Sequence, residues 1–263
     1  MRVFLKNLRK GWFGGVFPPL IVSLMAPMIT GIWPSFKEQA AAFAEILKNP
    51  IYKTLLGDMV MFDMSTWEGM FYMYAGLILE YAILFVAILV PVRLITNEVD
   101  KNTLDVTLSY PIPRWRYILE KFGVFLTYST LYPILLYAFA VVCTNALGET
   151  MDFTVLSYAF IGAYLQLISL GAISLLCGAI FLESSRALSV SGALILAQYV
   201  ITRLGDLGPF NLLKDLSLFK YVSMGTVTRL GEIPMNEATV LIVVGLVALV
   251  TALYVFEKRE LAF

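Results

Sequence analysis

The sequence has no histidine, and this absence excludes several kinds of catalytic and binding site. A Ser-His hydrolase, a zinc protease with histidine ligands and a haem protein with a histidine ligand all need an imidazole group. The sequence also lacks a G-x-x-x-x-G-K loop followed by Ser or Thr, so this chain does not bind ATP in the P-loop manner. These absences exclude most kinds of intramembrane catalysis, and we expect a chain that is not itself an enzyme and that holds neither a metal ion nor a cofactor.

Charged residues are scarce, and apolar residues take their place. Asp, Glu, Lys and Arg make up 14% of the 263 residues, whereas 59% are hydrophobic and the mean hydropathy is +0.81. A soluble domain usually has about 25% charged residues, because its surface must be solvated. Every aspartate falls in a loop or at the end of an apolar run, so the aspartate pair of an intramembrane aspartyl protease is also missing. The composition predicts an integral membrane protein.

Apolar runs long enough to cross a bilayer recur along the chain. A hydrocarbon core of about 30 Å requires roughly 20 apolar residues in a helix. Six runs meet this requirement: 13–33, 67–95, 122–144, 153–182, 187–204 and 237–256. None of them alternates between apolar and polar residues as the strands of a membrane barrel do. We therefore expect an all-α, polytopic membrane protein with six transmembrane helices.

Helix-capping patterns refine several of these boundaries. Residues 65–68 (STWE) fit a capping box, and Asp152 and Asn236 are placed to cap the fourth and sixth spans. Residues 35–38 (SFKE) fit a second capping box, and apolar residues then recur at helical spacing up to Pro50. This second pattern predicts a short surface helix after the first span.

Basic residues indicate how the chain is oriented. If the N-terminus is cytoplasmic, the cytoplasmic segments hold twelve of the nineteen Lys and Arg residues, and the outer segment 145–152 holds none. Both termini are therefore predicted to be cytoplasmic. The basic and apolar side chains of residues 1–12 suit a cytoplasmic interfacial helix on anionic membrane lipid, although simple positive-inside flanking explains them too. We expect a single transmembrane domain over residues 1–263, with an outer re-entrant or surface segment at 205–236.

Glu80 is the charged residue that lies well inside a predicted span. An ionised acidic side chain at the centre of a bilayer costs roughly 2.5–3.5 kcal/mol on insertion scales, so it should face the bundle interior, be protonated or form a pair. One interpretation places Glu80 on a translocation path, where it touches substrate or a proton. The other makes it a structural carboxyl group, hydrogen-bonded to a neighbouring helix or to a symmetry mate.

Residues 97–113 form a charged segment between the second and third spans. A helical pattern runs through it and ends at Pro111 and Pro113. The residues of one helical face are Glu98, Lys101 and Asp105, and the adjoining apolar stripe holds Leu104 and Leu108. Basic residues beyond the prolines fit the headgroup region at the start of the third span. The pattern predicts a short cytoplasmic helix, and a solvated charged loop is the alternative.

This segment resembles the first cytoplasmic loop in the permeases of type-2 ABC exporters. The residues that carry the resemblance are Glu98, Thr103, Leu104, Asp105, Leu108, Ser109, Pro111, Arg114 and Lys121. The family usually has glycine where this sequence has Asn102, and asparagine tolerates a positive φ better than most residues. The stretches LSLFKYV at 216–222 and VFEKREL at 255–261 are similar to the last outer segment and the cytoplasmic end of the same family.

The resemblance implies a function and a set of partners. In that family the loop is a coupling helix that docks into a separate ATP-binding subunit, and this partner binds ATP and Mg. The residues expected to couple the chain to the ATPase are Glu98, Lys101, Asn102, Thr103, Leu104, Asp105, Leu108, Pro111 and Arg114. The expected assembly is a permease homodimer with two copies of the ATPase in the plasma (inner) membrane. No nucleic-acid partner is expected.

Two other functions would use a similar set of spans. A membrane anchor or assembly subunit that transports nothing would have a closed, apolar dimer seam, whereas an exporter needs a polar interior that water can reach. An ion channel gated without ATP would transport without any partner. No residue pattern assigns a substrate.

Overall fold

The computed structural model describes residues 2–47, 49, 62–101, 103–104, 113–205 and 211–259. All regular secondary structure in these ranges is helical. Six helical segments are long and apolar enough to cross a membrane: 4–37, 67–100, 114–147, 153–181, 184–205 and 235–258. Each of them overlaps one predicted span, so the prediction of an all-α protein with six membrane-spanning segments is confirmed.

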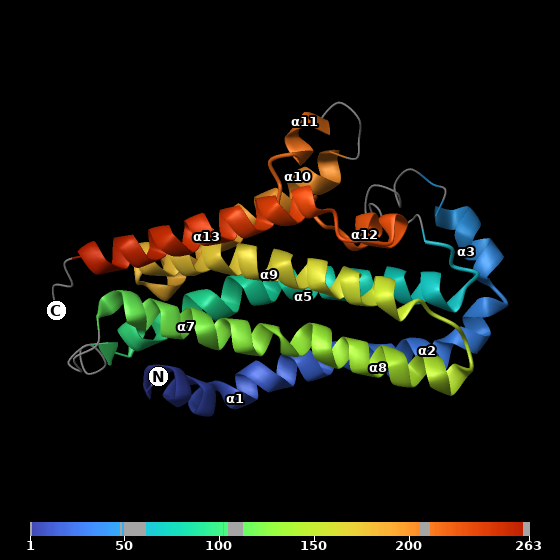
Figure 1. Cartoon of the computed structure of the whole chain (residues 1–263), viewed down its shortest axis with the longest axis horizontal. Helices are drawn as coiled ribbons and strands as arrows, with labels where there is room; N and C mark the ends of the chain where they lie inside the picture. The colour runs from blue at the N-terminus through green and yellow to red at the C-terminus, as the bar shows by residue number, and fades with distance from the viewer. Residues whose placement is uncertain are drawn as a thin grey trace.

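The centre of the bundle is formed by two long helices, α5 (Trp67–Asp100) and α9 (Phe153–Phe181), which pack against each other. α13 (Met235–Lys258) and α10 (Ser184–Gly205) also pack against α9 (Figure 1). In α9, 67% of the most apolar stretch is buried inside the protein, against 28% in α13 and 22% in α10. The outer helices therefore leave much of their apolar surface for lipid, and α9 is shielded from it.

The first and third spans each consist of two helices. They are α1 (Arg2–Ser23) with α2 (Met25–Lys37), and α7 (Arg114–Ser129) with α8 (Leu131–Leu147). The junction residues are Leu24 and Thr130, and a proline follows three residues after each, at Pro27 and Pro133. Proline has no N–H and its ring crowds the carbonyl four residues earlier, so a helix bends there. The two bent spans pack against each other beside the central helices (Figure 1).

Both chain termini lie at the same end of the bundle in Figure 1, as an even number of spans requires. We call this the terminal end and the opposite end, where α3 (Ala40–Leu47) lies, the distal end. The assignment of the terminal end to the cytoplasm stays a prediction. α1 continues through Trp12 without a break, so residues 2–12 extend the first span rather than forming a separate helix. Their contact with membrane lipid also stays a prediction.

One predicted cap is confirmed and another is shifted by one residue. The Asp152 carboxylate accepts hydrogen bonds from the backbone N–H groups of Thr154 and Val155, at 2.8 and 3.2 Å, and so caps α9. α5 is capped by Thr66, whose side-chain oxygen accepts from the Gly69 N–H at 3.1 Å. The capping box at residues 65–68 therefore marks the right helix start, although Ser65 itself is not the cap.

Two other predicted caps are wrong. Ser35 lies inside α2, which continues to Lys37, so the capping box at 35–38 does not begin a helix. The short helix expected after it is present as α3. Asn236 lies inside α13, because the helix begins after Pro234, whose fixed φ already suits a helix start. In both cases the helix includes a residue that the local pattern had placed at a helix boundary.

The connection between α10 and α13 folds back against α9. It contains α11 (Asn211–Lys214) and α12 (Met224–Leu230). Val222 has a φ of 53°, unusual for a β-branched residue, and its side chain lies so close to Gly162 of α9 that a Cβ there would be 2.5 Å from Val222 Cγ1. Gly162 therefore allows this non-helical chain to approach the central helix.

Side chains of neighbouring helices hydrogen-bond the backbone of this connection. The Gln166 amide of α9 donates to the carbonyls of Phe219 and Tyr221 at 3.3 and 2.7 Å. The Gln198 side chain of α10 accepts from the Leu218 N–H at 3.1 Å, and the Glu237 carboxylate accepts from the Val222 N–H at 2.6 Å. Non-helical backbone among spanning helices needs such partners, because lipid supplies none. We call residues 217–222 the clasped segment.

Candidate functional site

A buried ion pair lies where the predicted coupling segment leaves the bundle. Lys121 Nζ of α7 lies 2.6 Å from Glu98 Oε1 of α5. The side chain of Lys121 is 1% exposed and that of Glu98 is 17% exposed. Charge-assisted hydrogen bonds are short and strong, and each buried charge depends on the other. Glu98, predicted as a coupling residue, therefore fixes the end of α5 to the middle of α7.

Three further side chains join this pair. The Tyr117 hydroxyl donates to Glu98 Oε2 at 3.0 Å, and Lys121 Nζ donates to Asn7 Oδ1 at 3.1 Å. The ring of Tyr117 stacks on Phe256, with centroids 5.5 Å apart and planes 16° apart. We call these five residues the terminal-end junction. It connects α1, α5, α7 and α13 at one point.

The chain after α5 turns back on this junction. The Thr103 N–H donates to the Glu98 carbonyl at 2.8 Å, and Leu104 is 1% exposed and belongs to the hydrophobic core. Lys101 is exposed. In this arrangement the Leu104 side chain belongs to the core of the protein itself. Asn102, Asp105, Leu108 and Pro111 lie outside the described residues, and the coupling role of the whole set stays a prediction.

Arg114 ties the start of α7 to the end of the chain. Its guanidinium donates to the Arg259 carbonyl at 2.6 Å, and the Glu257 carboxylate accepts from the Trp115 N–H at 2.9 Å. The Arg259 guanidinium in turn donates to the carbonyls of Ala179, at 3.2 Å, and Ile180 at the end of α9. Arg114 therefore makes contacts within this chain, beside the predicted coupling segment.

Glu80 is paired across the bundle with Arg203 of α10. The two side chains are 15% and 14% exposed, and the Arg203 guanidinium also lies over the ring of Tyr199, 5.1 Å from its centroid. An ion pair lowers the cost of both charges among apolar helices. Arg203 ends the fifth span, so its pairing with Glu80 shows that α10 ends beside the middle of α5.

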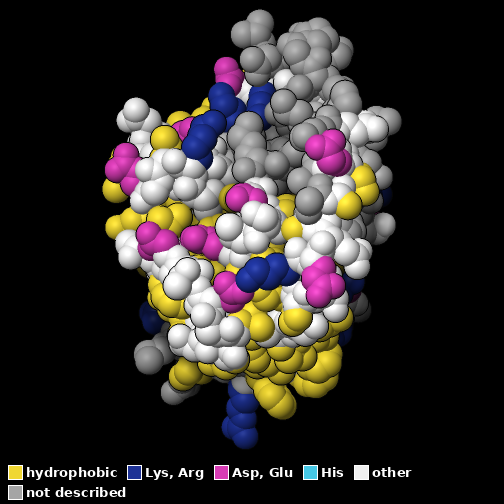
Figure 2. All heavy atoms as spheres, turned by 90° about the vertical axis from the view of Figure 1, so that its right-hand side faces the viewer, with side chains coloured by type: hydrophobic (Ala, Val, Ile, Leu, Met, Phe, Trp, Pro, Cys, Tyr) yellow, Lys and Arg dark blue, Asp and Glu magenta, His cyan; other side chains and the backbone are white. Residues whose placement is uncertain are grey.

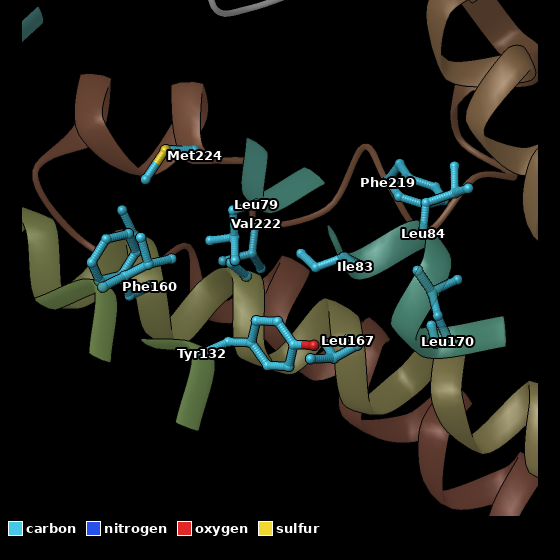
Figure 3. Packing of buried hydrophobic residues seen from close by; sticks show 14 of the residues in the cluster. Leu79, Ile83, Leu84, Tyr132, Phe160, Leu167, Leu170, Phe219, Val222 and Met224 are labelled. Carbon is cyan, nitrogen blue, oxygen red and sulfur yellow. The ribbon is translucent and has the colours of Figure 1, made fainter. Parts of the chain in front are cut away.

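A cavity of about 50 Å³ lies next to this pair, between α5, α9, α10 and the connection that contains the clasped segment. Its walls include Glu80, Arg203 and Gln166, together with apolar side chains of α5 and of the connection. Figure 3 shows Leu79 and Ile83 of α5 close to Phe219 and Val222. The bundle thus has a polar interior site at the position of Glu80. Whether substrate passes it stays a prediction.

Hydrogen bonds at the distal end join different helices. The indole N–H of Trp33 and the ammonium of Lys37 both donate to Glu149 Oε1, each at 3.0 Å, and Trp67 Nε1 donates to Thr144 Oγ1 at 2.9 Å. The Trp33 indole, and then Lys37, hold the pKa of the Glu149 carboxyl below its ordinary value. Figure 2 shows this end face-on, with acidic and basic side chains scattered over it.

Sequence reasoning missed the basic partners of both buried ion pairs. Lys121 belonged to the motif and was placed, with the other basic residues beyond the prolines, in the headgroup region, because nothing local shows that its side chain is buried. Arg203 looked like a flanking charge at the end of a short apolar run. The sequence contains a carboxylate inside one predicted span and a basic residue at the end of another. Such a combination indicates an ion pair between the two spans.

The described residues contain no group of three or more His, Cys, Asp or Glu side chains that could hold a metal ion. Two physical properties follow from this arrangement. The terminal-end junction can transmit a displacement of the segment between α5 and α7 to other helices. The cavity at Glu80 can admit water or a small polar group.

Comparisons with known proteins give the chain a family. The family model described as "ABC-2 family transporter protein" matches residues 28–261. The chain is also similar to the "Uncharacterized membrane protein YdbK" of Bacillus subtilis (strain 168), with 25% identity over 187 residues, which cover 66% of this chain and 75% of that protein. No solved structure matches it significantly. Because the family model covers most of the chain, this multi-pass membrane protein belongs to the ABC-2 family of transporter proteins.

Proposed function

We propose that this chain is the permease subunit of an ABC exporter in the plasma membrane, working as a homodimer with two copies of a separate ATP-binding subunit. The observation that carries the proposal is the match of the ABC-2 transporter model to residues 28–261. The motif at Glu98 to Lys121 supports the coupling role, and the polar cavity at Glu80 supports a path rather than a sealed anchor.

The proposed mechanism begins at the segment between α5 and α7. When ATP brings the two ATP-binding subunits together, they displace this segment. The terminal-end junction passes the displacement to α1 through Asn7 and to α13 through the Tyr117–Phe256 stack. Packed helices then move as rigid bodies, which shifts α5 relative to α10 and opens the path beside Glu80. ATP and Mg act on the partner subunit.

The test is reconstitution of the full chain with a P-loop ATP-binding subunit, sought first among the genes beside this one. We expect the two to co-purify, and we expect this chain to stimulate ATP hydrolysis in lipid vesicles. Lys101→Ala, a substitution at an exposed position, should weaken the stimulation of ATP hydrolysis only slightly, because an exposed ion pair is worth about 0–1 kcal/mol. Leu104→Asp should abolish stimulation, because it forces a charge into the buried contact that holds the coupling segment to the bundle.

The alternatives predict different results. An anchor or assembly subunit would bind the ATP-binding protein without ATP-dependent transport. A channel would conduct ions in vesicles that contain this chain alone. A Leu104→Asp protein that is folded and stimulates hydrolysis like the parent would contradict the coupling role. Size-exclusion chromatography shows whether that variant is still folded and dimeric.

A further inference from the structure

The carbonyl groups at the end of α9 are hydrogen-bonded from two sources. A helix leaves its last C=O groups without partners inside the helix, so other groups must bond them. The two residues that follow α9 donate their N–H groups to the carbonyls of Gly178 and Phe181, at 3.1 and 2.7 Å. The Arg259 guanidinium donates to the two carbonyls between these, those of Ala179 and Ile180. A residue from the end of the described chain thus completes the cap of α9.

The turn between α9 and α10 is short and has an unusual backbone conformation. Only Leu182 and Glu183 lie between the two helices, and Leu182 has a φ of 57°, which is unfavourable for a residue with a Cβ. Such a conformation persists where the surrounding structure holds it. Ser184, the first residue of α10, shares a hydrogen bond with Thr96 of α5. The positive Arg259 side chain also lies favourably at the negative end of the α9 helix dipole, so it stabilises this turn.

The backbone of Arg259 is bonded to the start of α7. The Arg114 guanidinium donates to the Arg259 carbonyl at 2.6 Å, and the neighbouring Trp115 N–H donates to the Glu257 carboxylate at 2.9 Å. Arg114 directly follows the charged segment 97–113. A displacement of that segment therefore moves Arg259 through its backbone, and the Arg259 side chain carries the movement to the end of α9.

We propose that Arg259 is a positioning residue that passes a displacement of the charged segment to the turn between α9 and α10. α10 runs from Ser184 to Gly205 without a proline, so a movement of its start reaches Arg203 and the ion pair with Glu80. This route is separate from the terminal-end junction, which leads to α1 and α13. Transmission of the movement rests on the proposed function; the stabilisation of the turn by Arg259 does not.

The first test uses the full chain, without partner, in phosphatidylcholine nanodiscs. Mass spectrometry measures hydrogen exchange of the backbone amides of residues 178–187. Arg259→Met removes the donor groups and keeps an unbranched side chain. We expect these amides to exchange about tenfold faster, because the loss of one charged donor makes local opening easier. Arg259→Lys keeps a cation with N–H donors and should retain most of the protection.

Lys258→Met is the matched control, because it removes the same charge one position away. Lys258 is exposed, and its ammonium group lies over the ring of Tyr254, 4.6 Å from the centroid. This variant should leave exchange at 178–187 unchanged. Parental exchange in Arg259→Met, or equal acceleration in both variants, would overturn the proposal. If Arg259→Met does not fold, as size-exclusion chromatography would show, Arg259→Gln takes its place in the same comparison.

The second test adds the ATP-binding subunit and measures a response that a purely structural role would leave unchanged. In the parent, we expect ATP with vanadate to change hydrogen exchange at 178–187 and in α1. In Arg259→Met the subunit should still co-purify and the response in α1 should remain, whereas the response at 178–187 should be lost.

The outcomes of this second test separate the two proposals. A response at 178–187 that is the same in Arg259→Met as in the parent would overturn the transmission role of Arg259 and leave the proposed function intact. If the parent neither co-purifies with the subunit nor responds in any segment, the proposed function fails, and the transmission role fails with it. The exchange measured without partner then still decides whether Arg259 holds the turn.

Discussion

At the terminal end of the bundle the helices are joined by a buried charge pair, whereas at the distal end they are joined by tryptophan hydrogen bonds and an exposed pair. Lys121 and Glu98 are 1% and 17% exposed, but Lys37 and Glu149 are 57% and 29% exposed. Breaking a buried pair leaves a charge without water, whereas water readily replaces an exposed one. The terminal end should therefore move as a unit, and the distal end should tolerate local change.

Replacing Lys121 with methionine should have the largest effect. Methionine keeps much of the side-chain volume but removes the ammonium group that pairs with Glu98. The loss of one member of a buried pair costs about 3–5 kcal/mol, and we expect the lower part of this range because Glu98 is partly exposed. Thermal or denaturant unfolding of the purified protein measures it.

The double variant Glu98→Gln with Lys121→Met is the control for this prediction. It removes both charges, so it should recover much of the stability that the single variant loses. A single variant as stable as the parent would contradict the comparison, since it would mean that the terminal-end pair behaves like an exposed one.

Gly162→Ala should have an intermediate effect on stability. Gly162 belongs neither to the terminal-end junction nor to the contacts at the distal end. A Cβ at this position would lie 2.5 Å from Val222 Cγ1 and 3.0 Å from the Val222 carbonyl oxygen. Such overpacking typically costs about 1–3 kcal/mol, because the clasped segment must shift. The same unfolding measurement applies.

Gly192→Ala is the matched control on α10. A Cβ there would meet no atom within 4 Å, so alanine should stabilise the helix by up to about 1 kcal/mol through its higher helix propensity. Effects of the same sign for the two substitutions would mean that the clasped segment does not rest on Gly162.

The smallest expected effect is a pH dependence at the distal end. Because hydrogen bonds from Trp33 and Lys37 lower the pKa of Glu149, its contribution to stability is present above the ordinary carboxyl pKa. It is lost as the pH falls through the lower pKa of the folded state. Glu149→Gln should flatten the fall in unfolding temperature between about pH 6 and about pH 3. The effect should stay within the range of exposed pairs, about 0–1 kcal/mol.

Glu38→Gln, the same change at an exposed acid of the distal end, provides the comparison. It should leave the acid dependence close to that of the parent. If both variants flatten the curve equally, the dependence comes from net charge rather than from the contacts of Glu149.

The sequence was sufficient where the controlling interaction is local or depends on composition. The six spans follow from apolar run length, and the cap at Asp152 follows from bonds to residues two and three positions away. The caps at Ser35 and Asn236 failed because the same local pattern also occurs inside helices, where backbone continuity decides the boundary.

The candidate sites depend on distant residues, and there the sequence was insufficient. Glu80 and Arg203 are 123 positions apart, so only the packing of α10 on α5 brings them together. Helical spacing placed Leu104 on an apolar stripe, but spacing does not show whether that stripe faces a partner or the protein's own core. It faces the core. The charged segment was recognised by its resemblance to a family, and its contacts had to come from the structure.

The carboxylates of the two buried ion pairs, Glu80 and Glu98, are both carried by α5, which runs as one helix from Trp67 to Asp100. Glu80 and Glu98 are separated by eighteen positions, which is about five full turns, so they lie in register on the same side of the helix, roughly 27 Å apart. A rotation of α5 about its own axis would therefore disturb both ion pairs in the same sense. Pro91 lies between them and provides the one place where the helix can absorb part of a twist. The two ion pairs are thus coupled through the rotation of one helix about its axis.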